Sequence, residues 1–102
     1  MTMLHTVNKS PFERDAFGSC LSLAKKGSSI LLIEDGIYAA IKGSKVAGQV
    51  TDSMNGHSIY VLGPDVKARG MQEEQIIDGI RVVDYGGFVD LVTEHDTVQS
   101  WL

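Results

Sequence analysis

The sequence predicts an α/β fold, with a single domain over residues 1–102 and a mainly parallel sheet of about five strands flanked by helices. Two observations lead to this prediction. Short apolar runs alternate along the chain with helical patterns, which is the order expected when crossover helices connect parallel strands. The chain has 102 residues, of which 43% are hydrophobic and 22% charged, and these values are typical of one globular domain.

Five segments have the length and composition of strands. The clearest is residues 28–33 (SSILLI), a continuous apolar run that suits a strand with both faces buried. The others are more mixed, and polar or glycine-containing sequence separates them. The predicted strands comprise residues 3–7, 28–33, 58–62, 80–84 and 97–102.

The first helix has sequence signals at both ends. Ser10, Pro11 and Glu13 match a capping box, with a serine cap, a proline at the first helical position and a glutamate three residues after the cap. Gly27 suits the C-terminal end, because glycine readily adopts the left-handed conformation that often ends a helix. The sequence therefore predicts a helix between these two signals.

Later segments predict three more helices and one long connection. The helices cover residues 37–42, residues 65–70 and a stretch that follows Tyr85 and extends to His95. Residues 43–57 are polar and contain glycine, and we expect them to form a mobile or functional loop. The chain closes near Trp101, which we expect to pack either on its own sheet or on another chain.

Cys20 is the single cysteine of the chain, and its place on the first helix favours burial. On a helical wheel it lies near the middle of an apolar arc, and Lys25 and Lys26 point elsewhere. Burial among apolar side chains raises the pKa of a thiol and makes it unreactive. A second interpretation stays open, because an apolar arc can also face a groove or a subunit interface through which another protein reaches the thiol.

Composition argues against several partners and locations. The formal net charge is −4 and basic residues do not cluster beyond the pair Lys25-Lys26, so direct binding of nucleic acid is disfavoured. No apolar run reaches the ~18 residues that cross a bilayer, and the first residues lack the pattern of a signal peptide. One cysteine forms no internal disulfide. We therefore expect a soluble, cytoplasmic protein without a membrane partner.

Metal and cofactor motifs are not found in the sequence. His5, His57 and His95 are not spaced as metal ligands, and no phosphate-binding glycine-rich loop occurs. A phosphorylation receiver domain is disfavoured as well, because acidic residues do not cluster at the end of the first predicted strand. We expect neither a metal nor a cofactor.

Glu34 and Asp35 form a second candidate site. They follow a predicted strand, and ligands of open parallel sheets bind beyond the carboxyl ends of the strands. Two adjacent carboxylates at this position suit a cation or acid–base chemistry. The alternative, which the local sequence favours, is that Asp35 caps the next helix and Gly36 eases the turn.

Short motifs occur over nearly the whole chain, and each alone is weak. They are MLHTV and SPF near the N-terminus (residues 3–7 and 10–12), LLIEDGIYAA (31–40), YVL (60–62), Asp65, ARG (68–70), DYGGFV (84–89) and Ser100-Trp101. Together they resemble the DsrH/TusB family of sulfur-relay subunits. The cysteine at position 20 makes the chain more similar to the DsrH branch, tied to intracellular sulfur oxidation, than to the TusB branch, which serves 2-thiolation of the tRNA wobble uridine.

This resemblance implies a DsrE-like fold, an α/β three-layer sandwich, within a cytoplasmic complex. The implied partners are DsrE/TusD-like and DsrF/TusC-like subunits, in a heterohexamer with two copies of each subunit, and a protein that donates or accepts sulfur. In the family, the best-supported persulfide-carrying cysteine belongs to the DsrE/TusD subunit. Cys20 matches the cysteine position of the DsrH branch and is the candidate catalytic residue of this chain.

Two functional hypotheses follow from the resemblance. In the first, the chain passes persulfide sulfur between protein cysteines, and Cys20 is an acceptor or secondary carrier, which requires an exposed and activated thiolate. In the second, the chain is a non-catalytic subunit that assembles and shapes the complex, while a partner carries the sulfur and Cys20 only packs.

Overall fold

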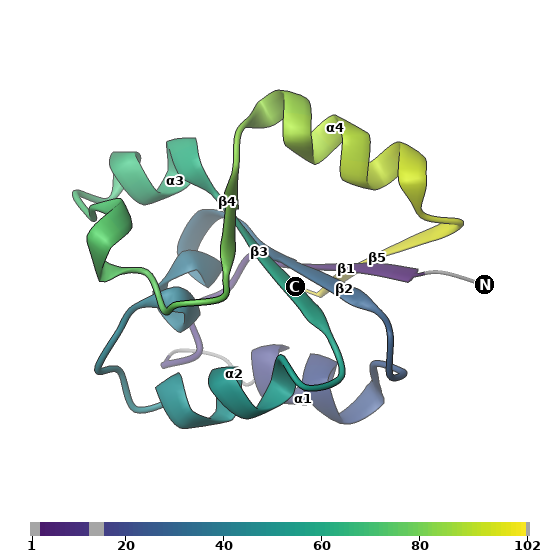
Figure 1. Ribbon diagram of the computed structural model, residues 1–102, viewed down its shortest axis with the longest axis horizontal. Helices are drawn as coiled ribbons and strands as arrows, with labels where there is room; N and C mark the ends of the chain where they lie inside the picture. Colours follow the sequence, from purple (N-terminus) through teal and green to yellow (C-terminus); the bar gives the residue numbers. More distant parts are fainter. Residues whose placement is uncertain (1–2, 13–15, 102) are drawn as a thin grey trace.

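The computed structural model describes residues 3–12 and 16–101, which form a five-stranded parallel sheet with helices on both faces (Figure 1). The strand order is β4-β3-β2-β1-β5. Every predicted strand is present within one residue of its expected bounds in the described ranges, so the predicted fold class is confirmed. The strands are β1 (Met3–Val7), β2 (Ser29–Leu32), β3 (Ser58–Leu62), β4 (Arg81–Val83) and β5 (Thr97–Trp101).

The central strand β2 is buried along its whole length, as its continuous apolar sequence predicts. Leu31 of β2 lies opposite Thr6 of β1 on one side and opposite Tyr60 of β3 on the other. β5 pairs with β1 and forms a largely exposed edge of the sheet. The first four strands therefore extend the sheet in one direction, and β5 is added on the opposite side of β1.

Helices on the two faces of the sheet produce three layers. α1 (Ala16–Leu23) and α2 (Ala47–Ser53) cover one face, and α4 (Tyr85–Glu94) crosses the other (Figure 1). Right-handed crossovers explain this arrangement, because the direction of strand addition reverses between β4 and β5. Within the described ranges, none of the helices is long and apolar enough to span a bilayer. The remaining connections contain the 3-10 helix η1 (Glu34–Ala40), α3 (Gly63–Ala68) and the 3-10 helix η2 (Glu73–Gln75).

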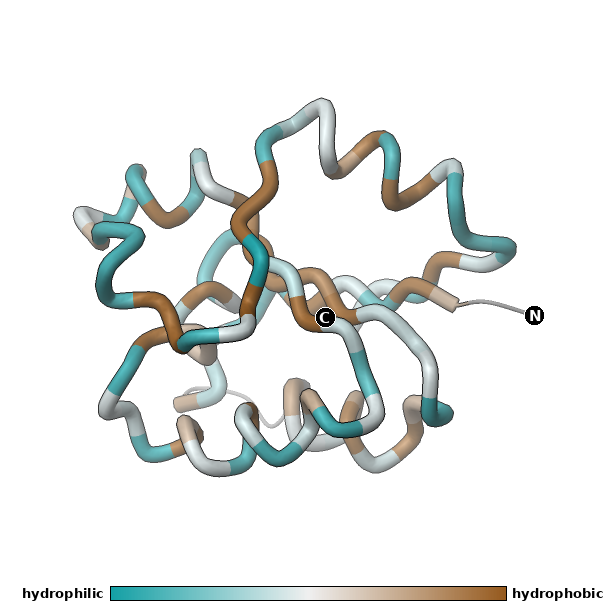
Figure 2. Tube along the Cα trace, in the orientation of Figure 1, coloured by the Kyte–Doolittle hydropathy of each residue, from teal (hydrophilic) through white to brown (hydrophobic). Residues whose placement is uncertain are grey.

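Two hydrophobic clusters join the layers. The larger lies between the sheet and the helices α1 and α2, where Cys20 of α1 and Val50 of α2 are both buried. The smaller lies beneath α4, where Leu91 packs with Leu4 and Leu31 of the sheet. Figure 2 shows hydrophobic residues along the central strands and again along α4. Burial of apolar surface on both faces of the sheet thus fixes the three layers.

The predicted start of the first helix is wrong. The Ser10 hydroxyl accepts a hydrogen bond from the backbone N–H of Phe12 at 3.2 Å, within a turn. This is the bond of a serine cap, but residues 11–12 form a turn and the described part of α1 begins only at Ala16. Glu13, the other expected member of the capping box, lies outside the described residues. At its other end α1 stops at Leu23, and the left-handed Gly27 (φ 92°) belongs to the following turn.

The predicted loop at residues 43–57 is also wrong, because it contains α2. Val46, Val50 and Met54 recur at helical spacing, and all three pack in or against the larger hydrophobic cluster. Helices as short as α2 are not stable by propensity alone, so the burial of this apolar side explains its formation. The polar, glycine-containing sequence faces away from the core.

The other helices agree with prediction in position more than in bounds. The helix expected at residues 37–42 is the 3-10 helix η1, which ends at Ala40, and the one expected at residues 65–70 is α3, which starts at Gly63 with Pro64 in its first turn. The last helix is confirmed as α4. Asp84 caps it, because its carboxylate accepts a hydrogen bond from the Gly87 N–H at 2.8 Å.

Candidate functional site

Cys20, the candidate sulfur carrier, is fully buried. Its side chain has no exposed surface and lies in the larger hydrophobic cluster with Phe17 from the same helix. Burial raises the pKa of the Cys20 thiol from its ordinary value of 9.0 to about 12, because the thiolate would lose its hydration. The burial that the helical wheel predicts is therefore confirmed, and the sulfur is protonated at neutral pH.

Transfer of sulfur to Cys20 needs conditions that this conformation does not provide. Attack on a persulfide requires a thiolate, and the two reacting sulfur atoms must touch. A pKa raised by about three units lowers the ionised fraction at neutral pH roughly a thousandfold. Contact with a second protein requires α1 to move off the sheet, which also exposes Phe17. Cys20 becomes reactive only if the core opens.

Glu34 and Asp35 do not form a paired acid–base site. The Asp35 carboxylate forms an ion pair with Arg69, with 2.9 Å between Oδ1 and Nε. The backbone N–H of Glu34 donates to Asp65 Oδ2 at 2.6 Å. The prediction that Asp35 caps a helix is wrong, because η1 has no side-chain cap. Both acidic contacts join η1 to α3, and their role is to hold the two segments together.

Gly36 lets η1 lie directly against the end of β1. A Cβ atom at this position would be 2.1 Å from the backbone oxygen of Val7 and 2.9 Å from its carbonyl carbon. Contacts this short do not occur, so any side chain at residue 36 would separate η1 from the sheet. The predicted turn at Gly36 is thus present, and close backbone approach is the reason for glycine.

Two of the histidines join distant parts of the fold. His95 lies at the end of α4, with Nδ1 2.6 Å from the Leu91 oxygen and Nε2 2.9 Å from the Ser29 hydroxyl. His5 accepts a hydrogen bond at Nδ1 from the Trp101 indole N–H at 3.0 Å. Trp101 therefore packs on its own sheet, which was one of the two expectations. Across the described part of the chain, no three His, Cys, Asp or Glu residues are grouped as metal ligands.

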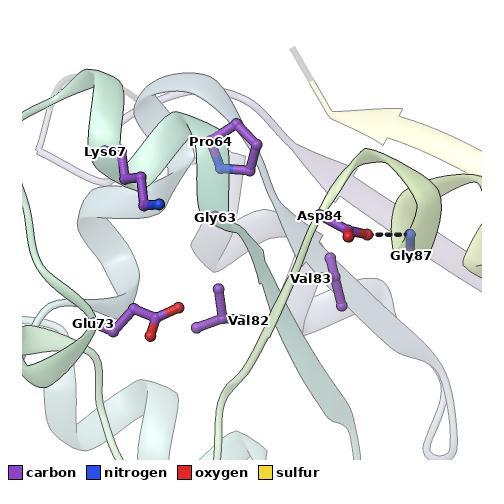
Figure 3. A pocket seen from close by; sticks show the side chains of 8 residues that line it. All are labelled: Gly63, Pro64, Lys67, Glu73, Val82, Val83, Asp84 and Gly87. Atoms are coloured by element: carbon purple, nitrogen blue, oxygen red, sulfur yellow. Dashed lines mark hydrogen bonds between the residues drawn. The ribbon is translucent and has the colours of Figure 1, made fainter.

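A cavity of about 680 Å³ lies beyond the carboxyl ends of β3 and β4, where open parallel sheets bind ligands. Lys67 of α3 and Glu73 of η2 point into it (Figure 3). Asp84 caps the N-terminus of α4 at the same place, so a negative charge already occupies the end that favours anions. The lining contains no cysteine, histidine or serine, so this cavity suits binding rather than sulfur chemistry.

Sequence reasoning missed this cavity, although two glycines indicate it. A Cβ at Gly63 would lie 3.1 Å from Val82 Cγ1, and one at Gly87 would lie 2.9 Å from Val83 Cβ. Gly63 directly follows β3, and Gly87 comes shortly after β4. Both allow the first turns of α3 and α4 to lie close to β4. Glycine after two neighbouring strands was the signal that the sequence offered.

The outer face of α4 has an exposed apolar surface, which we call the α4 stripe (Tyr85, Val89 and Val92). These residues are spaced four and three apart, and they are 61%, 60% and 38% exposed. Asp90 and Glu94 are exposed on the same helix, and α4 contains no basic residue. Apolar side chains in register on one helix face indicate a protein contact.

Comparison with known sequences identifies relatives that match along nearly the whole chain. The family model described as DsrH like protein matches residues 9–98. Protein TusB of Pectobacterium parmentieri is 36% identical over 99 residues, which covers 97% of this chain and 100% of the relative. Protein TusB of Escherichia coli K12 is 34% identical over 99 residues with the same coverage.

Solved structures with the same fold include two proteins of low sequence identity. The ychN protein from E. coli superimposes with a TM-score of 0.84 at 16% identity, over 98% of each chain. MTH1491 from Methanobacterium thermoautotrophicum, described as a protein of unknown function, gives a TM-score of 0.74 at 16% identity, over 96% of this chain and 97% of its own. At such identities the similarity shows the fold alone.

Proposed function

Because the chain belongs to the DsrH-like family along nearly its whole length, we propose that it is a subunit of a sulfur-relay complex that serves 2-thiolation of the tRNA wobble uridine. One observation carries the proposal, namely the match to TusB proteins at 34–37% identity over 97% of the chain. Cys20 alone indicates the branch tied to sulfur oxidation. The full-length relatives outweigh that single position and favour tRNA thiolation.

The proposed complex is cytoplasmic and contains DsrE/TusD-like and DsrF/TusC-like subunits, with two copies of each of the three chains. We assign the α4 stripe to contact with one of these homologous subunits. Apolar side chains that a small domain leaves exposed on one helix face are buried when an obligate partner binds.

Burial of Cys20 favours a relay in which the persulfide is formed on a cysteine of another chain. Cys20 as a persulfide carrier stays a separate proposal, which requires α1 to open when the complex is loaded. Mass spectrometry distinguishes the two. The assembled complex is incubated with a persulfide donor, and a gain of about 32 Da is sought on each subunit. A gain on the partner without one on Cys20 supports the first relay, and a gain on Cys20 supports the second.

The function itself is tested by deleting the gene and measuring the 2-thiouridine content of tRNA by liquid chromatography and mass spectrometry. We expect deletion to remove most of the 2-thiouridine at the wobble position and the wild-type gene to restore it. Unchanged 2-thiouridine in the deletion strain, with sulfur oxidation impaired instead, would place the chain in the other pathway.

A further inference from the structure

His5 and Trp101 connect the first strand of the chain to the last. His5 lies in β1, and Trp101 ends β5, which pairs with β1 at the edge of the sheet. Their ring centroids are 6.0 Å apart, and the indole N–H of Trp101 donates to His5 Nδ1 at 3.0 Å. The neighbouring bond from the Thr6 hydroxyl to Ser100 joins two groups that do not titrate. The contact between His5 and Trp101 is therefore a link between β1 and β5 that a proton can change.

This hydrogen bond requires one protonation state of His5. An indole N–H can only donate, so Nδ1 of His5 must be unprotonated to accept from Trp101. The neutral ring then carries its proton on Nε2, which is buried and has no hydrogen-bond partner among the described residues. A second proton, added at Nδ1, would place one N–H against another. Trp101 would then lose its acceptor, so the bond exists only while His5 is neutral.

The surroundings of His5 favour the neutral ring. The side chain is buried, and burial, followed by the charge of His57, lowers the pKa of His5 below its ordinary value of 6.5. Lys25 and Lys26 line the cavity beside His5, and none of the described residues of that lining is a carboxylate. All charged neighbours identified on this side are therefore basic and oppose a positive ring.

The elements packed around His5 supply no compensating negative charge. Its partners in register are Ile30 of β2 and Gln99 of β5, and both are uncharged. The helix α1, which packs against β1, contains no acidic residue between its bounds. Its buried Cys20 is protonated, because burial raises the pKa of that thiol to about 12. A protonated His5 would therefore lose a hydrogen bond and gain no ion pair.

The position of β5 allows its C-terminal end to respond locally. The strand pairs with β1 alone, and most of its side chains are exposed. Of its two apolar residues, Val98 is 41% exposed and Trp101 packs against the larger hydrophobic cluster. Segments with few buried contacts open at the lowest free energy. Trp101 is thus the main side-chain anchor of an edge strand.

We propose that the contact between His5 and Trp101 is a proton-sensitive latch, which holds the C-terminal end of β5 on the sheet while His5 is neutral and releases it when His5 takes up a proton. The proton comes from solvent and binds Nδ1, and the indole N–H then donates to water. A buried ring that is harder to protonate in the fold stabilises fully above pH 6.5 and less as the pH falls toward its folded pKa. This property belongs to the chain itself and does not depend on the proposed relay function.

Nuclear magnetic resonance provides the first test, because Trp101 is the single tryptophan and gives one indole N–H signal. The ring-nitrogen signals of His5 report its tautomer in the purified chain, and the indole signal is followed as the pH is lowered. We expect the tautomer protonated on Nε2 at neutral pH and an upfield shift of the indole proton that follows protonation of His5. A proton on Nδ1 at neutral pH, or an indole signal that ignores the titration of His5, would overturn the latch.

Variants connect the response to the two residues. In His5→Asn the amide oxygen takes the place of Nδ1 and accepts without titrating, so the indole signal should be constant over the same pH range. His57→Asn is the control and should keep the response. Trp101→Phe removes the donor and should raise the pKa of His5, because protonation then breaks no bond; this readout also serves if His5→Asn does not fold. A response kept in His5→Asn, or an unchanged pKa of His5 in Trp101→Phe, would contradict the proposal.

Amide hydrogen exchange tests whether the end of β5 opens. The change in protection between neutral pH and a pH below the pKa of His5 is compared for the wild-type chain and Trp101→Phe, so that the intrinsic pH dependence of exchange cancels. We expect the amides near the end of β5 to lose roughly fivefold more protection in the wild-type chain, and those of β3 to change equally in both proteins. An equal extra loss in β3 would indicate global unfolding, and no extra loss in β5 would show that the strand stays closed. Either result would refute a local latch.

Discussion

Replacing Cys20 with alanine isolates the effect of burying the thiol. The pKa of the thiol is 9.0 when exposed and about 12 in the fold. As the pH rises through the lower value, the unfolded chain loses the thiol proton and the folded chain keeps it. A group with a raised folded pKa stabilises fully below its unfolded pKa and less as the pH rises toward the folded one. Between about pH 8 and pH 10, this linkage lowers the free energy of unfolding by about 1.4 kcal/mol.

The alanine variant lacks this linkage but has a cost of its own. It leaves a sulfur-sized cavity in the core, which should destabilise it by about 1 kcal/mol at neutral pH. Urea unfolding of both proteins at the two pH values measures the difference between them. All other titrating groups are shared, so they cancel. We expect the wild-type chain to be the more stable at the lower pH and to lose that advantage at the higher pH. Identical pH dependence in the two proteins would refute a buried, protonated thiol.

Three further predictions concern backbone approach, ion pairing and assembly. Gly36→Ala should lower the free energy of unfolding by about 3 kcal/mol or more, because its Cβ would lie 2.1 Å from the Val7 carbonyl oxygen of β1. The control Gly48→Ala lies in α2, where no atom would come within 4 Å of the new Cβ, and it should raise the free energy of unfolding by up to about 1 kcal/mol. Asp35→Asn should cost about 1 kcal/mol in urea unfolding, whereas Asp78→Asn, from a more exposed ion pair, should cause no measurable change. Val89→Lys should leave the stability of the isolated chain unchanged and weaken its co-purification with partner subunits about tenfold; undiminished assembly would exclude the α4 stripe as the contact.

The strands could be predicted from the sequence because their signal is local and strong. The run at residues 28–33 is apolar on both faces, and the structure buries β2 completely. The wheel also predicted the burial of Cys20, because the apolar arc of a helix faces the core. In both cases the local hydrophobic pattern determines which faces of the element are buried.

The errors occurred where contacts distant in sequence decided the outcome. Asp35 fits a helix cap locally, but Arg69, far along the chain, takes its carboxylate. α2 was mistaken for a loop because its polar residues outnumber the apolar residues whose burial stabilises it. The contact between His5 and Trp101 required the pairing of β1 with β5, which no local pattern specifies.

The measurement that tests the account most directly is the 2-thiouridine content of tRNA in a deletion strain complemented with the wild-type chain or with Cys20→Ala. The account predicts that deletion removes most of the 2-thiouridine and that both genes restore it, because the chain serves the relay without exposing its own thiol. Wild-type levels of 2-thiouridine in the deletion strain would contradict the relay function. Restoration by the wild-type gene alone, with Cys20→Ala folded and assembled, would contradict a relay that bypasses Cys20.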